Sequence, residues 1–247
     1  MTLAAEQIAN YGDDGYLAVP DVFEAVQMDA ATFDAMAWAD ETLASVSPQE
    51  AQWYVDAGAP GNRLRKLDNP VHERAVFREL AGYAPLVEQV ETLLGKPGVS
   101  VYFSQIFFKA PGGGGPKPIH QDNCYFGPSD PDALVTAWIA LDDATVENGC
   151  LYYGKGSHLL GLAEHDAPQD EPFNLQLTPD AAARYNVTAA PMTRGGVLFH
   201  HGGTVHQSGH NTSDKWRRAV AFHYVSNEVT FVNPAWEFDP KFVERIT

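Results

Sequence analysis

The spacing of apolar residues changes abruptly at Val99, and this change limits what the chain can fold into. From Pro70 to Leu94 apolar residues recur every three or four positions, as they do along one face of a helix. From Val99 they alternate with a period of two, as they do in strands. The sequence therefore predicts helices in its first part and β-sheet in the rest.

The part before Val99 contains further predicted elements. Ala4 to Tyr11 has near-helical apolar spacing and is followed by the helix-breaking sequence Gly12-Asp13-Asp14-Gly15, and then by a strand pattern up to Pro20. Val22 to Leu43 predicts a long helix, and Ser45 to Pro60 predicts a loop. Residues 1–98 should thus form a mostly helical support.

After Val99, short strand patterns are separated by turn sequences rich in glycine and proline. These patterns cover Val99–Ala110, Pro118–Phe126, Leu134–Leu141, Cys150–Tyr153, Gly195–His200 and Arg217–Val225. Many short strands behind N-terminal helices predict a mainly β fold with flanking helices, in which two antiparallel sheets form a barrel of the jelly-roll type. We expect one domain over residues 1–247, with the jelly-roll core at 99–232 and an acidic insertion at about 161–185.

The charge balance restricts the partners. The chain has 32 acidic and 16 basic residues, a net charge of −16, which repels phosphate backbones and makes nucleic acid an unsuitable partner. It contains no apolar run of membrane-spanning length, and its first residues lack the pattern of a signal peptide. Its two cysteines do not make a disulfide framework, so we expect a cytoplasmic protein.

A His-x-Asp pair lies in the predicted strand Pro118–Phe126. Alternation of side chains would place His120 and Asp122 on one face, with Cys124 as a small packing residue beyond them. An imidazole and a carboxylate side by side supply two thirds of the 2-His-1-carboxylate site that holds Fe(II). The pair alone is weak evidence, since a surface strand with two polar residues has the same pattern.

A third ligand would have to be another histidine that the fold brings close. The candidates are His158, His165, His200, His201, His206, His210 and His223. His206 is favoured because Arg217 follows it at a distance that allows a turn and a return on the next strand, while His200 and His201 remain competitors. A guanidinium can grip the far carboxylate of an iron-chelating keto acid in a bidentate manner, and Ala219 and Ala221 leave room beside Arg217.

Together these segments resemble the phytanoyl-CoA dioxygenase-like branch of the Fe(II)/2-oxoglutarate oxygenases. The resemblance is carried by His120-Gln121-Asp122, Thr136–Leu141, Glu147–Leu151, Gly156-Ser157-His158 and His206-Gln207-Ser208-Gly209 with Arg217, and it covers nearly the whole chain. The chain departs from many relatives at His210, which follows the distal histidine motif.

The resemblance implies a double-stranded β-helix, cupin-like, with Fe(II) held by His120, Asp122 and His206. It also implies that Arg217 binds 2-oxoglutarate as co-substrate, and that further co-substrate contacts come from the pocket positions Trp138, Gln105 and Lys66. Lys66 lies in the basic cluster Asn62–Leu67, which is either a solvated face or a positive wall near the co-substrate. His158 is interpreted as a turn histidine, and Arg218 as a surface or packing residue.

The implied reaction uses O2 and 2-oxoglutarate to hydroxylate an unactivated C–H bond, with succinate and CO2 as co-products. Desaturation, epoxidation and ring formation use the same iron centre and stay open, as do a cupin-like metal enzyme that does not use 2-oxoglutarate and a non-catalytic binding barrel. Asp122 disfavours chlorination, because related halogenases replace this carboxylate with a small residue. The acidic balance favours a small metabolite or natural-product intermediate over a CoA thioester as substrate, and the oligomeric state is open.

Overall fold

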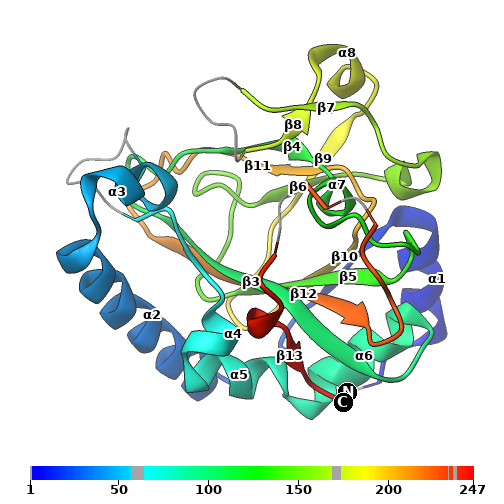
Figure 1. Ribbon diagram of the computed structural model, residues 1–247, viewed down its shortest axis with the longest axis horizontal. Coiled ribbons are helices and arrows are strands. Elements are labelled where there is room, and N and C mark those ends of the chain that lie inside the picture. Colours follow the sequence, from blue (N-terminus) through cyan, green and yellow to red (C-terminus); the bar gives the residue numbers. More distant parts are fainter. Residues whose placement is uncertain (1, 57–63, 169–173, 233, 236–237) are drawn as a thin grey trace.

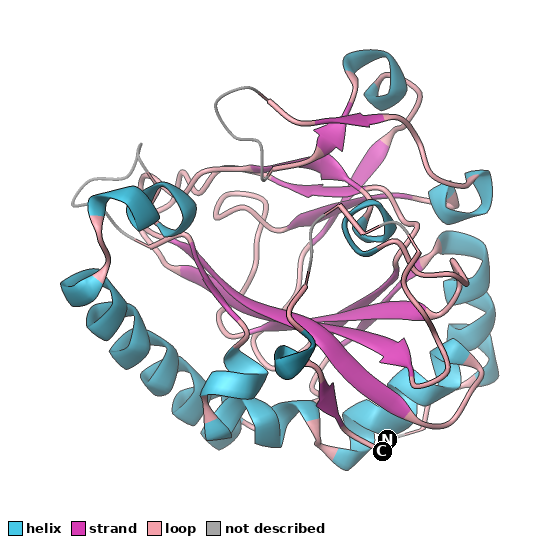
Figure 2. Cartoon of the chain, in the orientation of Figure 1, coloured by secondary structure: helices cyan, strands magenta, loops and turns pink. Residues whose placement is uncertain are grey.

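The computed structural model describes residues 2–56, 64–168, 174–232, 234–235 and 238–247. Two antiparallel sheets face each other, and helices cover the outer side of the larger one (Figures 1 and 2). The helices are α1 Ala5–Asp14, α2 Ala25–Ser45, α3 Pro48–Tyr54, α4 Pro70–Glu73, α5 Ala75–Ala81, α6 Ala84–Leu94, α7 Asp122–Phe126 and α8 Pro179–Ala182, with 3-10 turns at Ser157–Leu160 and Pro240–Phe242.

The large sheet has the strand order β1-β10-β5-β12-β3-β13, with β2 paired to β3, and the small sheet has the order β4-β11-β6-β9. The large-sheet strands are β1 Tyr16–Val19, β2 Lys66–Asp68, β3 Val99–Lys109, β5 Leu134–Ala140, β10 Val197–His201, β12 Arg217–Ser226 and β13 Glu244–Arg245. The small-sheet strands are β4 Lys117–His120, β6 Leu151–Gly154, β9 Val187–Ala190 and β11 His206–Ser208.

From β3 to β12 the chain crosses repeatedly between the two sheets, since β3, β5, β10 and β12 lie in the large sheet and β4, β6, β9 and β11 in the small one. This is the double-stranded β-helix topology, so the predicted mainly β fold with N-terminal helices is confirmed. The expectation of a barrel is corrected in one respect. Among the described residues no strand pairing joins the two sheets, and the core is an open sandwich.

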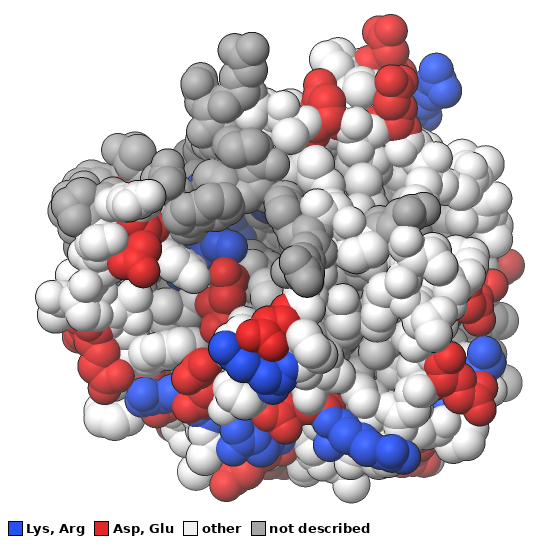
Figure 3. Space-filling model, viewed as in Figure 1, with Lys and Arg blue, Asp and Glu red and all other residues white. Residues whose placement is uncertain are grey.

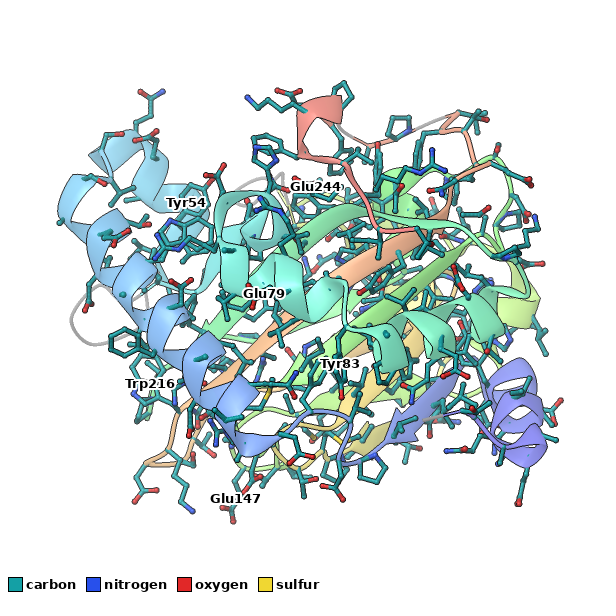
Figure 4. All side chains as sticks on the ribbon, turned by 90° about the horizontal axis from the view of Figure 1, so that it is seen from below. Tyr54, Glu79, Tyr83, Glu147, Trp216 and Glu244 are labelled. Carbon is teal, nitrogen blue, oxygen red and sulfur yellow. The ribbon has the colours of Figure 1, made fainter. Side chains whose placement is uncertain are left out.

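Strand β12 shows how the sequence gives the large sheet two different faces. Its bulky residues Val220, Phe222 and Tyr224 are fully buried in the core that also contains the apolar faces of α2, α5 and α6. The alternate residues, which begin with Arg217 and end with His223, point towards the small sheet, as the alternation predicts. Figure 4 shows α2, α5 and α6 lying across the large sheet on its covered face.

The regular alternation predicted for β3 is interrupted. The pairing of β3 with β12 shifts register between His223 and Tyr224, where Tyr102 is the extra residue on β3. The extra residue shifts the alternation of side chains by one position, so residues that alternate regularly in the sequence lie on opposite faces of the sheet before and after the bulge. Val101 therefore joins the core under the helices, while Phe103, Gln105 and Phe107 face the small sheet.

Two N-terminal boundaries differ from the prediction. Helix α1 continues through Gly12 and ends at Asp14, and the capping residue Gly15 adopts a left-handed conformation with φ of +78°. The predicted loop Ser45–Pro60 contains helix α3, and its residues 57–60 lie outside the described part of the chain. Ser47 caps α3 by accepting from the backbone N–H of Glu50, whose side chain accepts in return from the backbone N–H of Ser47.

The acidic insertion forms a small layer of its own. Its strands β7 His165–Asp166 and β8 Gln176–Leu177 pair with each other, and α8 follows. Leu177 and Ala181 pack with Ile119 of β4 and with Val205, which directly precedes β11, so this part of the insertion covers the small sheet. Residues 169–173 lie outside the described part.

Charged side chains of both signs gather over the helices at the lower edge of the face drawn in Figure 3. Many of them are paired: Arg74 contacts Asp34 at 2.8 Å and Glu41 at 3.2 Å. Within the described residues, no helix combines the length and the apolar character needed to cross a membrane.

Candidate metal centre

A cavity of about 460 Å³ lies between the two sheets. Residues of β3, β5 and β12 from the large sheet and of β4 and β11 from the small sheet line it. All seven residues singled out by the sequence for metal or co-substrate binding reach this cavity. They are His120, Asp122, His206, Arg217, Trp138, Gln105 and Lys66.

Three of these residues form a compact cluster of potential metal ligands. His120, Asp122 and His206 each offer one ligand atom, and these atoms lie within 4.8 Å of one another. His120 ends β4 and His206 begins β11, and the two residues are directly paired in the small sheet. All three side chains are buried, so a metal bound here would be largely shielded from bulk water.

Asp122 reaches the cluster by a different route from the one predicted. The predicted strand Pro118–Phe126 stops at His120, and Asp122 is the first residue of the short helix α7. The backbone N–H of Asn123 donates to the carbonyl of Gly202, which anchors the start of the helix beside β10. The helical turn also changes the cavity wall, because Tyr125 and Phe126 line the cavity and Cys124 does not.

Hydrogen bonds on the far side of each imidazole orient the metal-facing nitrogen. Nδ1 of His120 lies 2.8 Å from the carbonyl oxygen of Pro118, and Nδ1 of His206 lies 2.9 Å from that of Thr204. A carbonyl can only accept, so Nδ1 carries the proton and Nε2 presents its lone pair. The two Nε2 atoms lie 3.6 and 3.7 Å from Oδ1 of Asp122.

The second carboxylate oxygen of Asp122 is held by the protein. Thr136 donates its hydroxyl proton to Oδ2 at 2.6 Å, and Nε2 of His200 lies 3.0 Å from the same oxygen. His223 donates through Nδ1 to the Thr136 hydroxyl at 2.8 Å. Asp122 is therefore fixed through Oδ2, and Oδ1 is left to bind a metal in monodentate fashion.

Burial sets the protonation of the ligands. It lowers the pKa of His120 to about 4 and that of His206 well below its ordinary value, so both rings are neutral at physiological pH. Burial alone would raise the pKa of Asp122, but its contacts with the surrounding histidines, which include the hydrogen bond from His200, hold it well below its usual range. Two neutral imidazoles and one carboxylate are the donor set of a facial iron site.

The competing histidines lie outside this cluster. His200 contacts Asp122 from behind, as described above, and Nε2 of His201 contacts Asp132 at 3.1 Å. Nε2 of His158 lies 3.1 Å from the carbonyl of Gly12, which matches its interpretation as a turn histidine. Within the described residues, His120, Asp122 and His206 are the one group that satisfies the geometry of a metal site.

Arg217 is a buried cation at the wall of the same cavity. Its side chain is 2% exposed, and burial lowers its pKa to about 9. Among the described residues, none forms an ion pair or hydrogen bond with its guanidinium, and its Nε is a buried donor without an acceptor. The guanidinium carbon lies 5.5 Å from the centre of the Trp138 ring. A buried guanidinium without an acid is costly unless an anion binds to it.

The neighbouring Arg218 behaves as predicted for the opposite face. It forms a two-point ion pair with Asp142, at 2.7 Å from both carboxylate oxygens.

Gln105 and Lys66 reach the cavity but are engaged with the same acid. Gln105 donates to Oδ1 of Asp68 at 2.7 Å, and Lys66 donates to Oδ2 at 3.0 Å. Arg65 and Lys66 are half-buried on the cavity wall and do not form a solvated face, but Asp56 and Asp68 line the same cavity, so the wall carries charges of both signs. Residues 62 and 63 of the basic cluster lie outside the described part of the chain.

Sequence reasoning missed several residues that line the cavity, among them Asp68, Lys109, Thr136 and Ser208, and it missed Tyr153 behind the cluster. Lys109 is buried directly opposite Arg217 in the pairing of β3 with β12 and donates to the carbonyls of Gly115 and Gly209. Burial, with Arg217 nearby, lowers its pKa well below the ordinary value. The sequence pattern that could have indicated Lys109 is a lysine within an otherwise apolar predicted strand.

The geometry agrees with comparisons to known proteins. The sequence matches the model of the family described as phytanoyl-CoA dioxygenase over residues 11–219. It is 33% identical over 180 residues to mouse phytanoyl-CoA dioxygenase domain-containing protein 1, covering 71% of this chain and 62% of the relative. The chain thus spans about three fifths of the length of this relative.

Solved structures give the same picture for the fold. The non-haem α-ketoglutarate-dependent carbocyclase SnoK from nogalamycin biosynthesis is 26% identical, with a TM-score of 0.73 and coverage of 99% of this chain and 97% of SnoK. The epimerase SnoN, solved with Fe3+, α-ketoglutarate and nogalamycin RO, is 24% identical, with a TM-score of 0.71 and coverage of 95% and 91%. Since the family model covers most of the chain, the protein belongs to the phytanoyl-CoA dioxygenase family.

Proposed function

We propose that this protein is a non-haem Fe(II)- and 2-oxoglutarate-dependent dioxygenase that hydroxylates an unactivated C–H bond of a small molecule. His120, Asp122 and His206 would hold the iron, and Arg217 would bind the distal carboxylate of 2-oxoglutarate. When bound, iron and keto acid supply the power to oxidise the substrate with O2, giving succinate and CO2 as co-products.

The observation that carries this proposal is the pairing of two unusual features in one cavity. A cluster with the donor set of an iron site faces the same space as a buried guanidinium without an acid among the described residues. A metal site alone would suit any cupin-like enzyme. The buried arginine adds a requirement for an anionic co-substrate, because a carboxylate matches its planar fork.

The side chains around the cavity have separable roles in this proposal. The Trp138 ring would form one wall of the co-substrate site beside Arg217, and Gln105 and Lys66, both held by Asp68, would present polar groups near it. Phe103, Phe126 and Phe238 give the rest of the cavity an apolar, aromatic character. A substrate with a hydrocarbon surface would fill this part and exclude water from the reacting centre.

Hydroxylation is preferred to chlorination because Asp122 occupies the position that a chloride ion would need. Ring formation is the strongest alternative outcome, since SnoK, a carbocyclase, is 26% identical across almost the entire chain. SnoN shares the fold and is an epimerase, so the fold alone does not select one outcome.

The proposal is tested by anaerobic titration of the protein with Fe(II) and 2-oxoglutarate. We expect stoichiometric binding of both and the weak visible charge-transfer band of a chelated keto acid. A screen of small hydrophobic metabolites and natural-product intermediates is then scored by substrate-stimulated succinate and by the mass of the product. A gain of one oxygen atom supports hydroxylation for a substrate without a carbon–carbon double bond and leaves epoxidation open for an alkene, whereas a loss of two hydrogens supports desaturation or ring formation. Absence of both iron and keto-acid binding would refute the proposal.

His200→Leu tests the support behind the iron site. The variant removes a donor to Oδ2 of Asp122 while all three proposed ligands remain, so Fe(II) affinity should fall about 10- to 100-fold. The affinity is measured by anaerobic competition with a chelator. His201→Gln is the matched control, because this adjacent histidine contacts Asp132 and should leave the affinity unchanged. Equal affinities in both variants would show that Thr136 alone fixes the carboxylate.

A further inference from the structure

Tyr153 is a buried phenol close to the proposed iron centre that the proposed reaction does not use. It lies on β6, is fully buried, and pairs with His206 across the small sheet. It does not line the cavity, so it stands behind the ligands, away from the space for substrate. Its ring centre is 6.0 Å from that of His206.

A continuous hydrogen-bonded path joins this phenol to the proposed iron ligand Asp122. Nε2 of His200 lies 3.0 Å from Oδ2 of Asp122, and Nδ1 of the same ring lies 2.9 Å from the Tyr153 hydroxyl. An ionised carboxylate can only accept, so Nε2 carries the proton of a neutral His200. Nδ1 then accepts from the Tyr153 hydroxyl and is placed to take its proton.

A second tyrosine extends this path towards the surface. The ring of Tyr16 stacks on that of Tyr153, with centres 4.5 Å apart and planes inclined by 14°. Tyr16 opens β1 at the edge of the large sheet, directly opposite His200 in the pairing with β10, and is half-buried. Two phenols in contact therefore lead from the interior of the site to a partly exposed position.

We propose that Tyr153 and Tyr16 form a relay that reduces the oxidised iron centre when oxygen is activated without a substrate in place. This inference rests on the proposed function. In the first step Tyr153 gives one electron to the iron centre and its hydroxyl proton to Nδ1 of His200, which leaves a neutral tyrosyl radical beside an imidazolium.

In the second step Tyr16 gives one electron to the Tyr153 radical and its proton to solvent. Tyr153 recovers its own proton from His200, so both groups return to their starting state. The radical on Tyr16 is then quenched by one electron and one proton from a small-molecule reductant such as ascorbate or a thiol. Each electron that passes through the relay lowers the oxidation state of the iron centre by one.

Other oxidisable rings near the site are less suited to this role. Tyr125 has its ring centre 5.5 Å from that of His120, but its hydroxyl donates to the carbonyl of Leu175 and accepts from Lys117. A backbone carbonyl is a poor acceptor for a leaving proton. Trp138 lies 5.5 Å from the Arg217 guanidinium, whose positive charge opposes removal of an electron from the ring.

The experiment uses the 247-residue chain loaded anaerobically with Fe(II) and 2-oxoglutarate, with the charge-transfer band as proof of loading. Oxygen is admitted without substrate, and samples are freeze-quenched for electron paramagnetic resonance. We expect a tyrosyl radical whose hyperfine pattern narrows when the protein contains ring-deuterated tyrosine. Ascorbate added with the oxygen should shorten its lifetime.

Two variants locate the radical. Tyr153→Phe should lose the signal, and Tyr16→Phe should keep it on Tyr153 with a longer lifetime that ascorbate no longer shortens. Tyr152→Phe is the matched control, since this neighbour on β6 alternates to the other face and should leave the signal unchanged. Tyr16 is half-buried on an edge strand, so Tyr16→Phe should fold and can still test the relay if Tyr153→Phe does not fold.

The outcomes separate this inference from the proposed function. Failure of the protein to bind Fe(II) and 2-oxoglutarate overturns the proposed function, and the relay with it. A loaded protein that gives no tyrosyl radical on exposure to oxygen overturns the relay alone. The relay is equally overturned by a radical that survives unchanged in Tyr153→Phe, or by identical decay in Tyr16→Phe and the unaltered protein.

Discussion

Asp122→Ala is expected to abolish stoichiometric iron binding. The substitution removes the anionic ligand of the proposed site and leaves Thr136 and His200 without the oxygen that they hold. Loss of a residue behind the ligands typically costs 10- to 100-fold in affinity, so loss of a ligand should cost more than about 100-fold. Anaerobic Fe(II) titration measures this, and the charge-transfer band with 2-oxoglutarate should disappear.

His206→Gln provides an independent test of the same site, because it keeps a side chain of similar size and removes the imidazole. It should lose iron to the same degree. His201→Gln is the control for both variants, since it alters a buried histidine of the same region that lies outside the ligand cluster. Stoichiometric iron in Asp122→Ala would remove this residue from the ligand set, and retained binding in His206→Gln would favour His200 in its place.

Arg217→Met is expected to weaken 2-oxoglutarate binding without affecting Fe(II) binding. Fe(II) binding should remain, whereas 2-oxoglutarate binding should weaken by about 2–5 kcal/mol, roughly 30-fold to several thousand-fold, because a buried charged contact is lost. Isothermal titration with Fe(II) present separates the two affinities. Arg218→Met is a closely matched control, because the adjacent arginine lies on the opposite face in an ion pair with Asp142.

The same variant has an opposite expected effect on the protein without ligands. Burial disfavours the charged form of Arg217 and lowers its pKa to about 9. An apolar side chain of similar length removes that cost, so Arg217→Met should unfold at the same denaturant concentration as the original protein or a higher one. Undiminished 2-oxoglutarate binding in Arg217→Met would remove this arginine from the co-substrate site, and substrate turnover in the absence of 2-oxoglutarate would favour the cupin-like alternative.

The residues that meet at the cavity could be predicted where local pattern and chemistry agree. Alanines alternating with Arg217 along one strand indicate both the strand and the face that has room for a ligand, and β12 follows this pattern. Helix α3 could have been predicted too, because Ser47, Pro48 and Glu50 form a recognisable helix start.

Other features depend on partners distant in sequence and could not be predicted in this way. His120 and Asp122 were expected to lie together because side chains alternate along a strand, but it is the turn into α7 that brings them together. Helix α7 has five residues, which are too few to show a helical period in the sequence. The bulge at Tyr102 exists only in the pairing with β12. The roles of Thr136 and His200 behind Asp122 follow from neighbouring strands in the large sheet.

The pairing of His120 with His206 has a consequence for how the protein folds. These residues are 86 positions apart, so their contact closes a long loop, and the entropy of that closure must be overcome before the proposed ligands meet. Contacts of such high sequence separation make folding slow. If these residues hold iron as proposed, the iron would be bound tightly only after both sheets have formed. It would then stabilise the finished fold by mass action, so that iron-starved cells would hold a larger unfolded fraction of this chain.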